Sequence, residues 1–556
     1  MENFTLIKSK TMQSVKFLVF IFAFFVTACN SSKELPGLVS YQLSQNFVPI
    51  FMDREDNCIV EIDLLINDSV PSIELKEVEI IFDNKQQTDW LKTATINFLE
   101  IINDTIFSSI SFGESSNRKS AFKIKGSNTM VKGSYKLNIS FAAKNNSLLE
   151  SSAYLKEIRL TFDGNVKHTL STDSKFAYRP ALVLRSAGQD NCDTYRIPGI
   201  ITTKKGTLIT VYDNRYNNSK DLQEDIDIGM SRSTNGGQTW EPMKVIMDMG
   251  EWGGKPERLN GIGDPCVLYD HTTHTIWVAA LWMSGSSPEK MLWWDSQPGM
   301  SPDETGQFIL VKSSDDGITW SDPINITEQI KDNKWQLLLA GPGRGLTLDN
   351  GTLIIPAQFK KDIRIKAIDG GQYTCHSTIV YSTNGGISWQ IGSGAKSNTT
   401  ESQVVQLANG SIMLNMRDDL NRINKGEDNG RAVSVTNDMG KTWIEHPSSN
   451  SALPEPNCMA SLIEHTLHID GNPNQILFFS NPNSKTHRTH MTIKASKDGG
   501  TTWPCDNQIL LNEQAGFGYS CLTVINESTI GIVYEGIKEL YFQKVLVKDF
   551  NLQISK

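Results

Sequence analysis

Ser313-Ser314-Asp315-Asp316-Gly317-Ile318-Thr319-Trp320 is one of five copies of an eight-residue pattern in the C-terminal two-thirds of the chain. The pattern reads Ser or Thr, any residue, Asp or Asn, any residue, Gly, any residue, Thr or Ser, and Trp. Its short acceptor side chain can bind backbone N–H groups and its Gly tolerates positive φ, so each copy predicts a tight turn that the Trp packs onto a sheet. The other copies occupy residues 233–240, 382–389, 436–443 and 496–503.

The spacing of the pattern predicts the architecture around it. Successive copies begin 80, 69, 54 and 60 residues apart, which is long enough for one four-stranded blade and its loops. About 380 residues follow Phe176, and dividing by the mean spacing of about 66 gives close to six blades. We therefore expect a six-bladed β-propeller over 176–556, in which one degenerate blade lacks the pattern.

Composition bounds the number of domains and the kind of partner. The 556 residues are 39% hydrophobic and 21% charged, which is an ordinary globular composition but too long for one simple core. Two domains are expected. The net charge of -9 argues against nucleic acid or an anionic membrane surface as the main partner.

The N-terminus has the pattern of an export signal. Three lysines precede the apolar run 17–26, which fits a signal-peptide core and is too short to span a bilayer. The following Val26-Thr27-Ala28-Cys29 resembles a bacterial lipobox, which predicts a signal peptide over 1–28, lipidation of Cys29 and a polar tether over 29–38. The alternative is a cleaved secretory signal with a chance cysteine. The lipobox reading predicts an exported outer-membrane lipoprotein that meets the membrane only through its lipid.

Residues 39–175 carry a different pattern. Short runs rich in β-forming residues are separated by clusters of Asn, Asp, Gly and Ser, and the eight-residue pattern does not occur. This alternation predicts a β-sandwich of about 130 residues. Its role is open between a glycan-binding or spacer module and a packing domain without a ligand. The clearest runs are 58–66, 77–82, 105–112, 135–141 and 155–162.

Cysteine use gives no disulfide framework. Apart from Cys29, seven cysteines remain at scattered spacing, an odd number that favours buried small apolar side chains. The chain has no CxxC, HExxH or P-loop motif, so zinc, thiol-redox and nucleotide chemistry have no support.

The five repeats resemble the Asp-boxes of the sialidase family, and the resemblance covers about 176–556. The N-terminal sandwich is similar to the domain that some bacterial sialidases carry before the propeller. The resemblance implies an all-β fold, a six-bladed propeller preceded by a β-sandwich. It also implies an exo-α-sialidase that acts on sialylated glycans of glycoproteins and glycolipids, with no cofactor and no catalytic metal.

Three arginines lie where the family has its carboxylate clamp. A sialic acid bears a carboxylate on its anomeric carbon, and several guanidinium groups in forked geometry suit that group. Arg196, in Tyr195-Arg196-Ile197-Pro198, matches the family's Arg-Ile-Pro motif. Arg417 and Arg488 match the other two arginines, and Glu535 resembles the acid that orients the first.

The resemblance also assigns the nucleophile. An anionic nucleophile would approach the substrate carboxylate against like-charge repulsion, which a neutral hydroxyl avoids. Tyr519 matches the family's nucleophile and Glu401 matches the carboxylate that takes the phenol proton. Residues 401–417 read as a hairpin, which would place Glu401 beside Arg417.

An Asn-rich loop is the candidate carrier of the general acid. We expect Asp221 to donate the proton, with its pKa raised when substrate binds. Asp225 is the alternative, and Asp227 belongs to the following strand. Arg215 is expected to support the carboxylate or glycerol side of the sugar, and Asp264 resembles an acid near the N-acetyl and O4 side. Gln358 and the segment 341–345 are expected to shape the pocket.

Two further functions stay open. A trans-sialidase would use the same residues but exclude water and bind an acceptor sugar. A sialoglycan-binding propeller without turnover would keep the arginines and lose the acid or the nucleophile. Asp221, Glu401 and Tyr519 are all present, which favours an enzyme.

Overall fold

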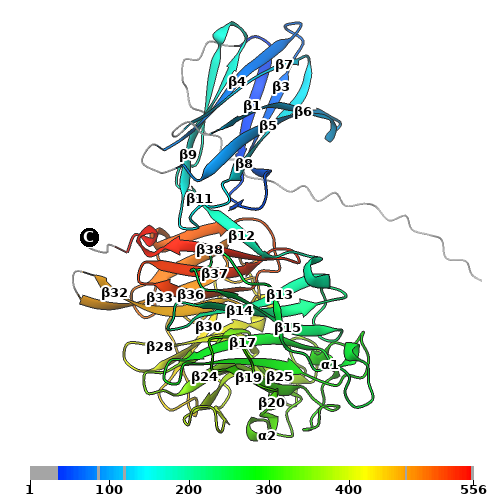
Figure 1. The fold of residues 1–556 in the computed structure, drawn as a ribbon, viewed down its shortest axis with the longest axis vertical. Coiled ribbons are helices and arrows are strands. Elements are labelled where there is room, and N and C mark those ends of the chain that lie inside the picture. Colours follow the sequence, from blue (N-terminus) through cyan, green and yellow to red (C-terminus); the bar gives the residue numbers. More distant parts are fainter. Residues whose placement is uncertain (1–34, 84–87, 117–120, 470–471, 553–556) are drawn as a thin grey trace, which may run out of the picture.

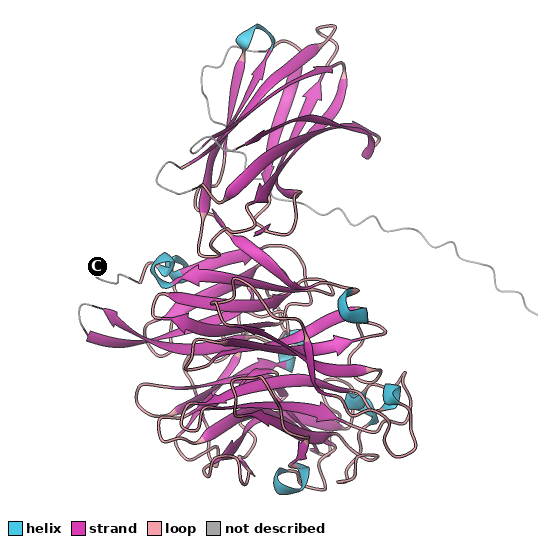
Figure 2. Ribbon diagram, viewed as in Figure 1, coloured by secondary structure: helices cyan, strands magenta, loops and turns pink. Residues whose placement is uncertain are grey.

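Strands make up nearly all of the regular structure (Figure 2). The structure is a computed structural model that describes residues 35–83, 88–116, 121–469 and 472–552. The predicted signal peptide, Cys29 and most of the predicted tether lie outside the described residues, so the lipid anchor stays a prediction. The expectation of an all-β chain, with a β-sandwich ahead of a six-bladed propeller, is confirmed (Figure 1).

Helices are short throughout the described ranges, and none of them is long and apolar enough to cross a membrane. The two α-helices are α1 (Leu292–Asp295) and α2 (Thr327–Ile330). The 3-10 turns are η1 (Asp163–Asn165), η2 (Gln189–Asn191), η3 (Glu257–Leu259), η4 (Asp419–Arg422), η5 (Cys505–Asn507) and η6 (Val547–Phe550).

Two antiparallel sheets form the N-terminal sandwich at the top of Figure 1. Buried side chains alternate along their strands, so each sheet turns an apolar face to the other. The rings of Phe82, Phe122 and Phe141 meet edge to face between the sheets. The first sheet has the order β1 (Leu38–Gln45), β3 (Asn57–Ile66), β8 (Gly133–Ala143), β5 (Leu91–Ile102), β6 (Thr105–Ser116). The second has the order β10 (Lys167–Ser171), β9 (Ala153–Phe162), β4 (Ile73–Phe82), β7 (Ala121–Met130), with β11 (Ala177–Tyr178) also paired to β9.

Six further sheets are the blades of the propeller, numbered here in chain order. Blade 1 is β13 (Thr194–Thr202), β14 (Leu208–Arg215), β15 (Ile226–Ser233) and β16 (Lys244–Met247). Blade 2 is β17 (Ile262–Asp270), β18 (Thr275–Trp282), β19 (Gln307–Ser313) and β20 (Ile324–Asn325), joined by β22 (Gly343–Arg344). Blade 3 is β21 (Leu337–Ala340), β24 (Leu353–Asp362), β25 (Tyr373–Ser382) and β26 (Gln390–Ile391), joined by β23 (Leu346–Thr347) and β27 (Lys396–Ser397).

The last three blades complete the ring. Blade 4 is β28 (Thr399–Gln406), β29 (Ile412–Asp418), β30 (Ala432–Thr436) and β31 (Ile444–Glu445). Blade 5 is β32 (Ser461–Ile469), β33 (Asn472–Pro482), β34 (Met491–Ser496) and β35 (Gln508–Asn512). Blade 6 is β36 (Ser520–Asn526), β37 (Thr529–Glu535), β38 (Leu540–Leu546) and β12 (Pro180–Arg185), joined by β2 (Ile50–Phe51).

Blade 6 is built from both ends of the propeller segment. β12 pairs antiparallel with β38 and lies beside it in Figure 1. In the other five blades the eight-residue pattern joins the third strand to the fourth. Blade 6 has no such connection, because its third and fourth strands are not consecutive in the chain. The missing sixth copy therefore marks the closure of the ring, which corrects the expectation of a degenerate blade.

The eight-residue turns close as expected. In the second copy Ser313 Oγ accepts from Gly317 N at 2.9 Å, while Asp315 accepts from Thr319 N at 2.8 Å and from Thr319 Oγ1 at 2.5 Å. Where Asn replaces Asp, Asn235 Oδ1 accepts from the backbone N–H of Thr239 at 3.0 Å, and its Nδ2 donates to the Thr239 hydroxyl. Asn therefore keeps the bond that shapes the turn.

The core of the propeller lies between neighbouring blades. Each of five apolar clusters draws its buried residues from two adjacent blades, from blades 1 and 2 through to blades 5 and 6. The tryptophan of a turn can fill this joint: Trp240 of blade 1 packs edge to face on Phe542 of blade 6, with ring centroids 5.2 Å apart. Blade-to-blade packing therefore fixes the ring on which the site is built.

The sandwich and the propeller share a joint. β2 comes from the loop between two sandwich strands and pairs parallel with β12, while β11, at the start of the predicted propeller segment, pairs with β9 of the sandwich. One continuous apolar cluster contains side chains of the sandwich and of blades 1 and 6. The two parts therefore exchange one short strand each.

Candidate active site

Irregular backbone occurs in or just ahead of the inner strands of the blades. Bulges interrupt β13, β17 and β28, and residues with positive φ lie in β13, β17 and β22 and in the segments ahead of β28, β32 and β36. A bulge changes the direction in which side chains point. Non-glycine residues with positive φ are uncommon, and they cluster at functional sites. The six residues are Ile197 (58°), Asp264 (57°), Gly343 (105°), Asn398 (59°), Asn457 (61°) and Gly518 (90°).

A pocket of about 290 Å³, open to solvent, lies among these strand ends. Its lining has a polar and an apolar part, which is the composition of a small-molecule site. The predicted residues on the polar part are Asp221, Asp264, Gln358, Glu401, Arg417 and Tyr519, beside Thr400 and Arg422. The apolar part has two contributions. Strands supply Leu281, Leu337 and Leu339, and the helical turn α1 with the residue before it supplies Met291, Leu292, Trp293 and Trp294.

Tyr519, Glu401 and Arg417 form one hydrogen-bonded group. The Tyr519 hydroxyl donates to Glu401 Oε1. Arg417 Nη1 donates to Glu401 Oε2 at 2.7 Å and to the Tyr519 oxygen at 3.2 Å. The β28–β29 hairpin brings Glu401 and Arg417 together, as the sequence predicts.

The environment sets opposite pKa shifts in this group. Burial alone would raise the pKa of Glu401, but the charge of Arg417 and the bond from Tyr519 outweigh it and hold this pKa below its ordinary value. Burial, followed by the charge of Glu401, raises the pKa of Tyr519 well above its ordinary value. At neutral pH the pair is therefore a neutral phenol bonded to a carboxylate, which can accept the phenol proton.

Three guanidinium groups surround the Tyr519 ring. Arg196 Cζ lies 5.0 Å and Arg488 Cζ 5.6 Å from the ring centroid, and Arg417 contacts the hydroxyl. Arg196 Nε donates to Glu535 at 3.1 Å, and Glu535 also accepts from the backbone N–H of Tyr519 at 2.9 Å. Guanidinium groups from blades 1, 4 and 5 therefore lie around one tyrosine, an arrangement of positive charge that suits an anionic ligand.

Asp221 faces this cluster from the loop after β14. Its Oδ1 accepts from Arg196 Nη1 at 3.0 Å and from Arg215 Nη1 at 2.8 Å, and its side chain stays 51% exposed. Burial would raise the pKa of Asp221, but Arg215 and then Arg196 outweigh it and lower this pKa. Arg215 is 1% exposed and also binds Asp213 at 2.8 Å, so it lies behind Asp221.

The alternative acid has a different setting. Asp225 does not line the pocket, and its Oδ1 has no hydrogen-bond partner among the described residues. Burial and the neighbouring Glu257 raise the pKa of Asp225 to about 6. Asp227 lies on β15, as expected, and accepts from the Tyr216 hydroxyl at 3.0 Å. The pocket geometry therefore favours Asp221 over Asp225.

Asp264 is held in a bulge of β17, where its backbone N–H donates to Asp213 Oδ1 at 2.9 Å. Burial, together with the charges of Asp213 and Asp221, raises the pKa of Asp264 well above its ordinary value. A neutral carboxyl in the pocket can donate as well as accept a hydrogen bond. The predicted segment 341–345 lies under the site, where the Gly343 position abuts Gln403 and Met459.

Several residues of the site were not predicted. Asp213 is one of them; it lies two residues before the predicted Arg215 on β14, so their shared face was readable from strand period alone. Asn457, which contacts both Arg417 and Arg488, comes from a loop with no recognisable pattern. The apolar wall comes from two blades and a single helical turn. The part of the chain that the structure describes has no cluster of side chains suited to a metal ion.

Comparison with known proteins gives one consistent relationship. Residues 206–532 match the family model described as a BNR repeat-like domain. A sialidase of Bacteroides fragilis (strain YCH46) is 40% identical over 529 residues, which is 90% of this chain and 94% of that protein. A sialidase of Micromonospora viridifaciens is 28% identical over 63% of this chain and 50% of that protein.

A solved structure shares the whole arrangement. The Hadza microbial sialidase Hz136 is 37% identical in sequence, with a TM-score of 0.81 over 91% of this chain and 99% of that chain. The similarity therefore includes the sandwich as well as the propeller.

Proposed function

Since this chain belongs to the sialidase family, we propose that it is a retaining exo-α-sialidase that removes terminal α-linked sialic acids from glycans. The observation that carries the proposal is the hydrogen bond from Tyr519 to Glu401 inside a ring of three arginines. A carboxylate bound by these arginines would set the anomeric carbon beside the phenol. A neutral nucleophile paired with a base suits such a substrate.

In the first half of the reaction the Tyr519 oxygen attacks the anomeric carbon and its proton passes to Glu401. The bond from that carbon to the glycosidic oxygen breaks, and the leaving oxygen takes a proton from Asp221. In the second half water attacks the same carbon and gives a proton to Asp221. The bond from that carbon to the Tyr519 oxygen breaks, and the phenol oxygen recovers its proton from Glu401. Two inversions at one carbon retain its configuration.

The three arginines act throughout. Arg196, Arg417 and Arg488 would hold the substrate carboxylate and fix the ring in reach of Tyr519. Asp264 would bond the amide side of the sugar, and Arg215 would hold Asp221 in place.

Substrate binding explains how Asp221 becomes an acid. Without substrate Asp221 is bound to Arg215 and to Arg196, and both hold its pKa below the ordinary value. A substrate carboxylate would compete for Arg196 and bring a second negative charge to the site. Both effects raise the pKa of Asp221, which is the direction that a proton donor needs.

The test is release of the fluorophore from an aryl α-sialoside by the protein, by Tyr519→Phe and by Asp221→Ala. The aryl group leaves with little protonation, so Asp221→Ala should lose much less activity on it than on a natural sialoglycan. Tyr519→Phe should lose about a thousandfold or more on both substrates.

The outcomes separate the alternatives. No turnover by the wild type, with sialic acid still bound, would make the protein a glycan-binding propeller. Transfer of sialic acid to added lactose in preference to water would make it a trans-sialidase. NMR detection of the β-anomer as first product would contradict retention.

A further inference from the structure

We propose that Asn457 is a positioning residue that sets the separation of the Arg417 and Arg488 guanidinium groups, and through it the affinity for the substrate carboxylate. The inference rests on the proposed function, because it concerns the same arginine clamp. Asn457 lies in the loop ahead of β32, where its φ is 61° and its side chain is 7% exposed.

One residue binds both guanidinium groups. The side-chain Oδ1 of Asn457 accepts from Arg417 Nη2 at 2.9 Å, and its backbone O accepts from Arg488 Nη2 at 3.1 Å. The two carbonyl groups are joined by a few covalent bonds. The arginines therefore cannot change their separation unless Asn457 moves or one of these bonds is lost.

The orientation of the Asn457 amide is fixed by its neighbours. Nδ2 donates to the Asp418 carbonyl at 3.0 Å and to Asp419 Oδ1 at 3.2 Å, both of which only accept. Arg417 only donates, so Oδ1 must face it. A flipped amide would lose all three bonds.

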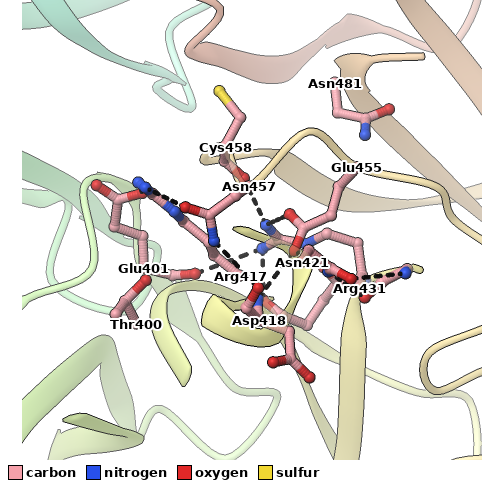
Figure 3. A network of polar contacts seen from close by, with 12 residues as sticks. Thr400, Glu401, Arg417, Asp418, Asn421, Arg431, Glu455, Asn457, Cys458 and Asn481 are labelled. Atoms are coloured by element: carbon pink, nitrogen blue, oxygen red, sulfur yellow. Dashed lines mark hydrogen bonds and ion pairs between the residues drawn. The ribbon is translucent and has the colours of Figure 1, made fainter. Parts of the chain in front are cut away.

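A buried ion pair holds the chain on both sides of Asn457 (Figure 3). Arg431 and Glu455 are fully buried and 2.8 Å apart. Glu455 accepts from the Asp418 backbone N–H at 2.9 Å, and Arg431 Nη1 donates to the Cys458 carbonyl at 2.7 Å. The same pair therefore ties the segment containing Asn457 to the end of β29, which carries Arg417. A pair of this kind is costly to bury, and loss of either partner would leave an unpaired buried charge beside this segment.

Loss of Oδ1 should act on Arg417 in a defined way. Its Nη1 is bound to Glu401 and Tyr519, and its Nε has no hydrogen-bond partner among the described residues. Without Asn457 Oδ1, the remaining attraction is toward Glu401. The Arg417 guanidinium group would then turn toward Glu401 and away from Arg488. This movement would weaken a contact in which both arginines bind the substrate carboxylate.

The main variant is Asn457→Gly in the full chain. Glycine accepts a φ of 61° and keeps the backbone carbonyl that binds Arg488, so only the side-chain bonds are removed. We expect KM for the aryl α-sialoside to rise about tenfold or more, with a smaller change in kcat.

The decisive measurement compares two inhibitors, a 2,3-unsaturated sialic acid and its carboxamide. In Asn457→Gly the inhibition constant of the acid should rise about tenfold while that of the carboxamide changes less than threefold. A general loosening of the site would weaken both inhibitors alike and would overturn the proposal.

Asn450→Gly is the matched control. Asn450 also has positive φ (53°) and also donates to Asp418, at 2.9 Å, but contacts none of the three arginines. Its KM and its ratio of inhibition constants should stay within about twofold of wild type. An equal loss in both variants would place the effect in the Asp418 network and contradict a role specific to Asn457.

Asn457→Asp is the second variant, which also serves if the glycine variant does not fold. It keeps the shape but sets a negative charge beside Arg417 and removes the donor to Asp418, so the acid inhibitor should again lose its advantage. An active wild type with unchanged inhibition constants in both variants refutes this inference alone. An inactive wild type refutes the proposed function.

Discussion

Each of the three arginines is held by a group from outside its own blade. Arg196 of blade 1 is bound by Glu535 of blade 6, and Arg417 of blade 4 is bound by Asn457 from the loop ahead of blade 5. Arg488 of blade 5 donates to the Phe517 carbonyl ahead of blade 6. The relative positions of the three guanidinium groups are therefore set by the assembled ring and not by any single blade.

Whether a contact of the site could be predicted from the sequence depends on how far apart its two residues lie in the chain. Glu401 and Arg417 share a hairpin, so their contact was predictable from strand pattern. The resemblance supplied Arg196, Tyr519 and the other predicted positions. Asp221, Asp264 and Tyr519 line one pocket, whereas Arg488 and Glu535 line a second one. Asn457 was not predictable, because a polar loop residue gains its role only from arginines on other elements.

The Asp221 environment predicts a pH effect. The free-protein pKa of Asp221 is lowered, so the protonated acid is lost from the free enzyme as pH rises through a low value. Bound substrate should raise that pKa, which keeps the acid protonated to higher pH. We expect the alkaline limb of kcat on a natural sialoglycan to lie about one pH unit or more above that of kcat/KM.

The measurement is a pair of pH profiles with a natural trisaccharide. Asp221→Asn should lose both alkaline limbs, whereas Asp225→Asn should keep them. Coincident limbs in the wild type would contradict a shift on binding.

At the scale of elements, the eight-residue turns depend on local hydrogen bonds, so the sequence predicts them in full. Their bonds run within eight residues, and an Asn in place of Asp keeps the shaping bond. Part of the sandwich was equally visible: all five predicted runs fall inside observed strands, although β1, β5, β7 and β10 contain none of them. β2 was not, because two residues carry no periodicity and their partner is far along the chain.

Asp315→Ala should lower the free energy of unfolding by about 1–2 kcal/mol, because it removes the acceptor of Thr319 N and Thr319 Oγ1. Asp315→Asn should lose less than about 0.5 kcal/mol, as Asn fills the same position in two natural copies. Urea denaturation measures both, with the exposed Asp322→Ala as control. Equal losses for Ala and Asn would show that the carboxylate charge, not the acceptor, holds the turn.

At the scale of the molecule, the sandwich and propeller are one packed body. Besides the exchanged strands, Gln238 of blade 1 donates to the Ser147 carbonyl at 2.7 Å, and Lys544 of blade 6 pairs with Glu150 at 2.7 Å. One apolar cluster runs through the joint. This packed joint differs from the flexible linkers that commonly separate domains.

We therefore expect sandwich and propeller to unfold together. Hydrogen exchange followed by mass spectrometry in rising urea should show β8 and β37 losing protection at the same concentration. Asn57→Ala should lower both midpoints equally, because Asn57 bonds the Phe51 backbone of β2 and the Phe141 carbonyl of β8. Protection of β37 that outlasts that of β8 would contradict this coupling.

The closure of blade 6 by β12 has a consequence for how the chain is made. The ribosome produces β12 before the other blades, yet its partner β38 is the last strand of the ring to emerge. Through most of synthesis β12 has an open edge, which is a hazard for wrong pairing. The sandwich precedes β12 and supplies β2 to its other side, so the earliest part of the chain to fold can hold this strand ready. Closure of the ring then waits for β38, and a chain cut short before β38 has no route to a closed propeller.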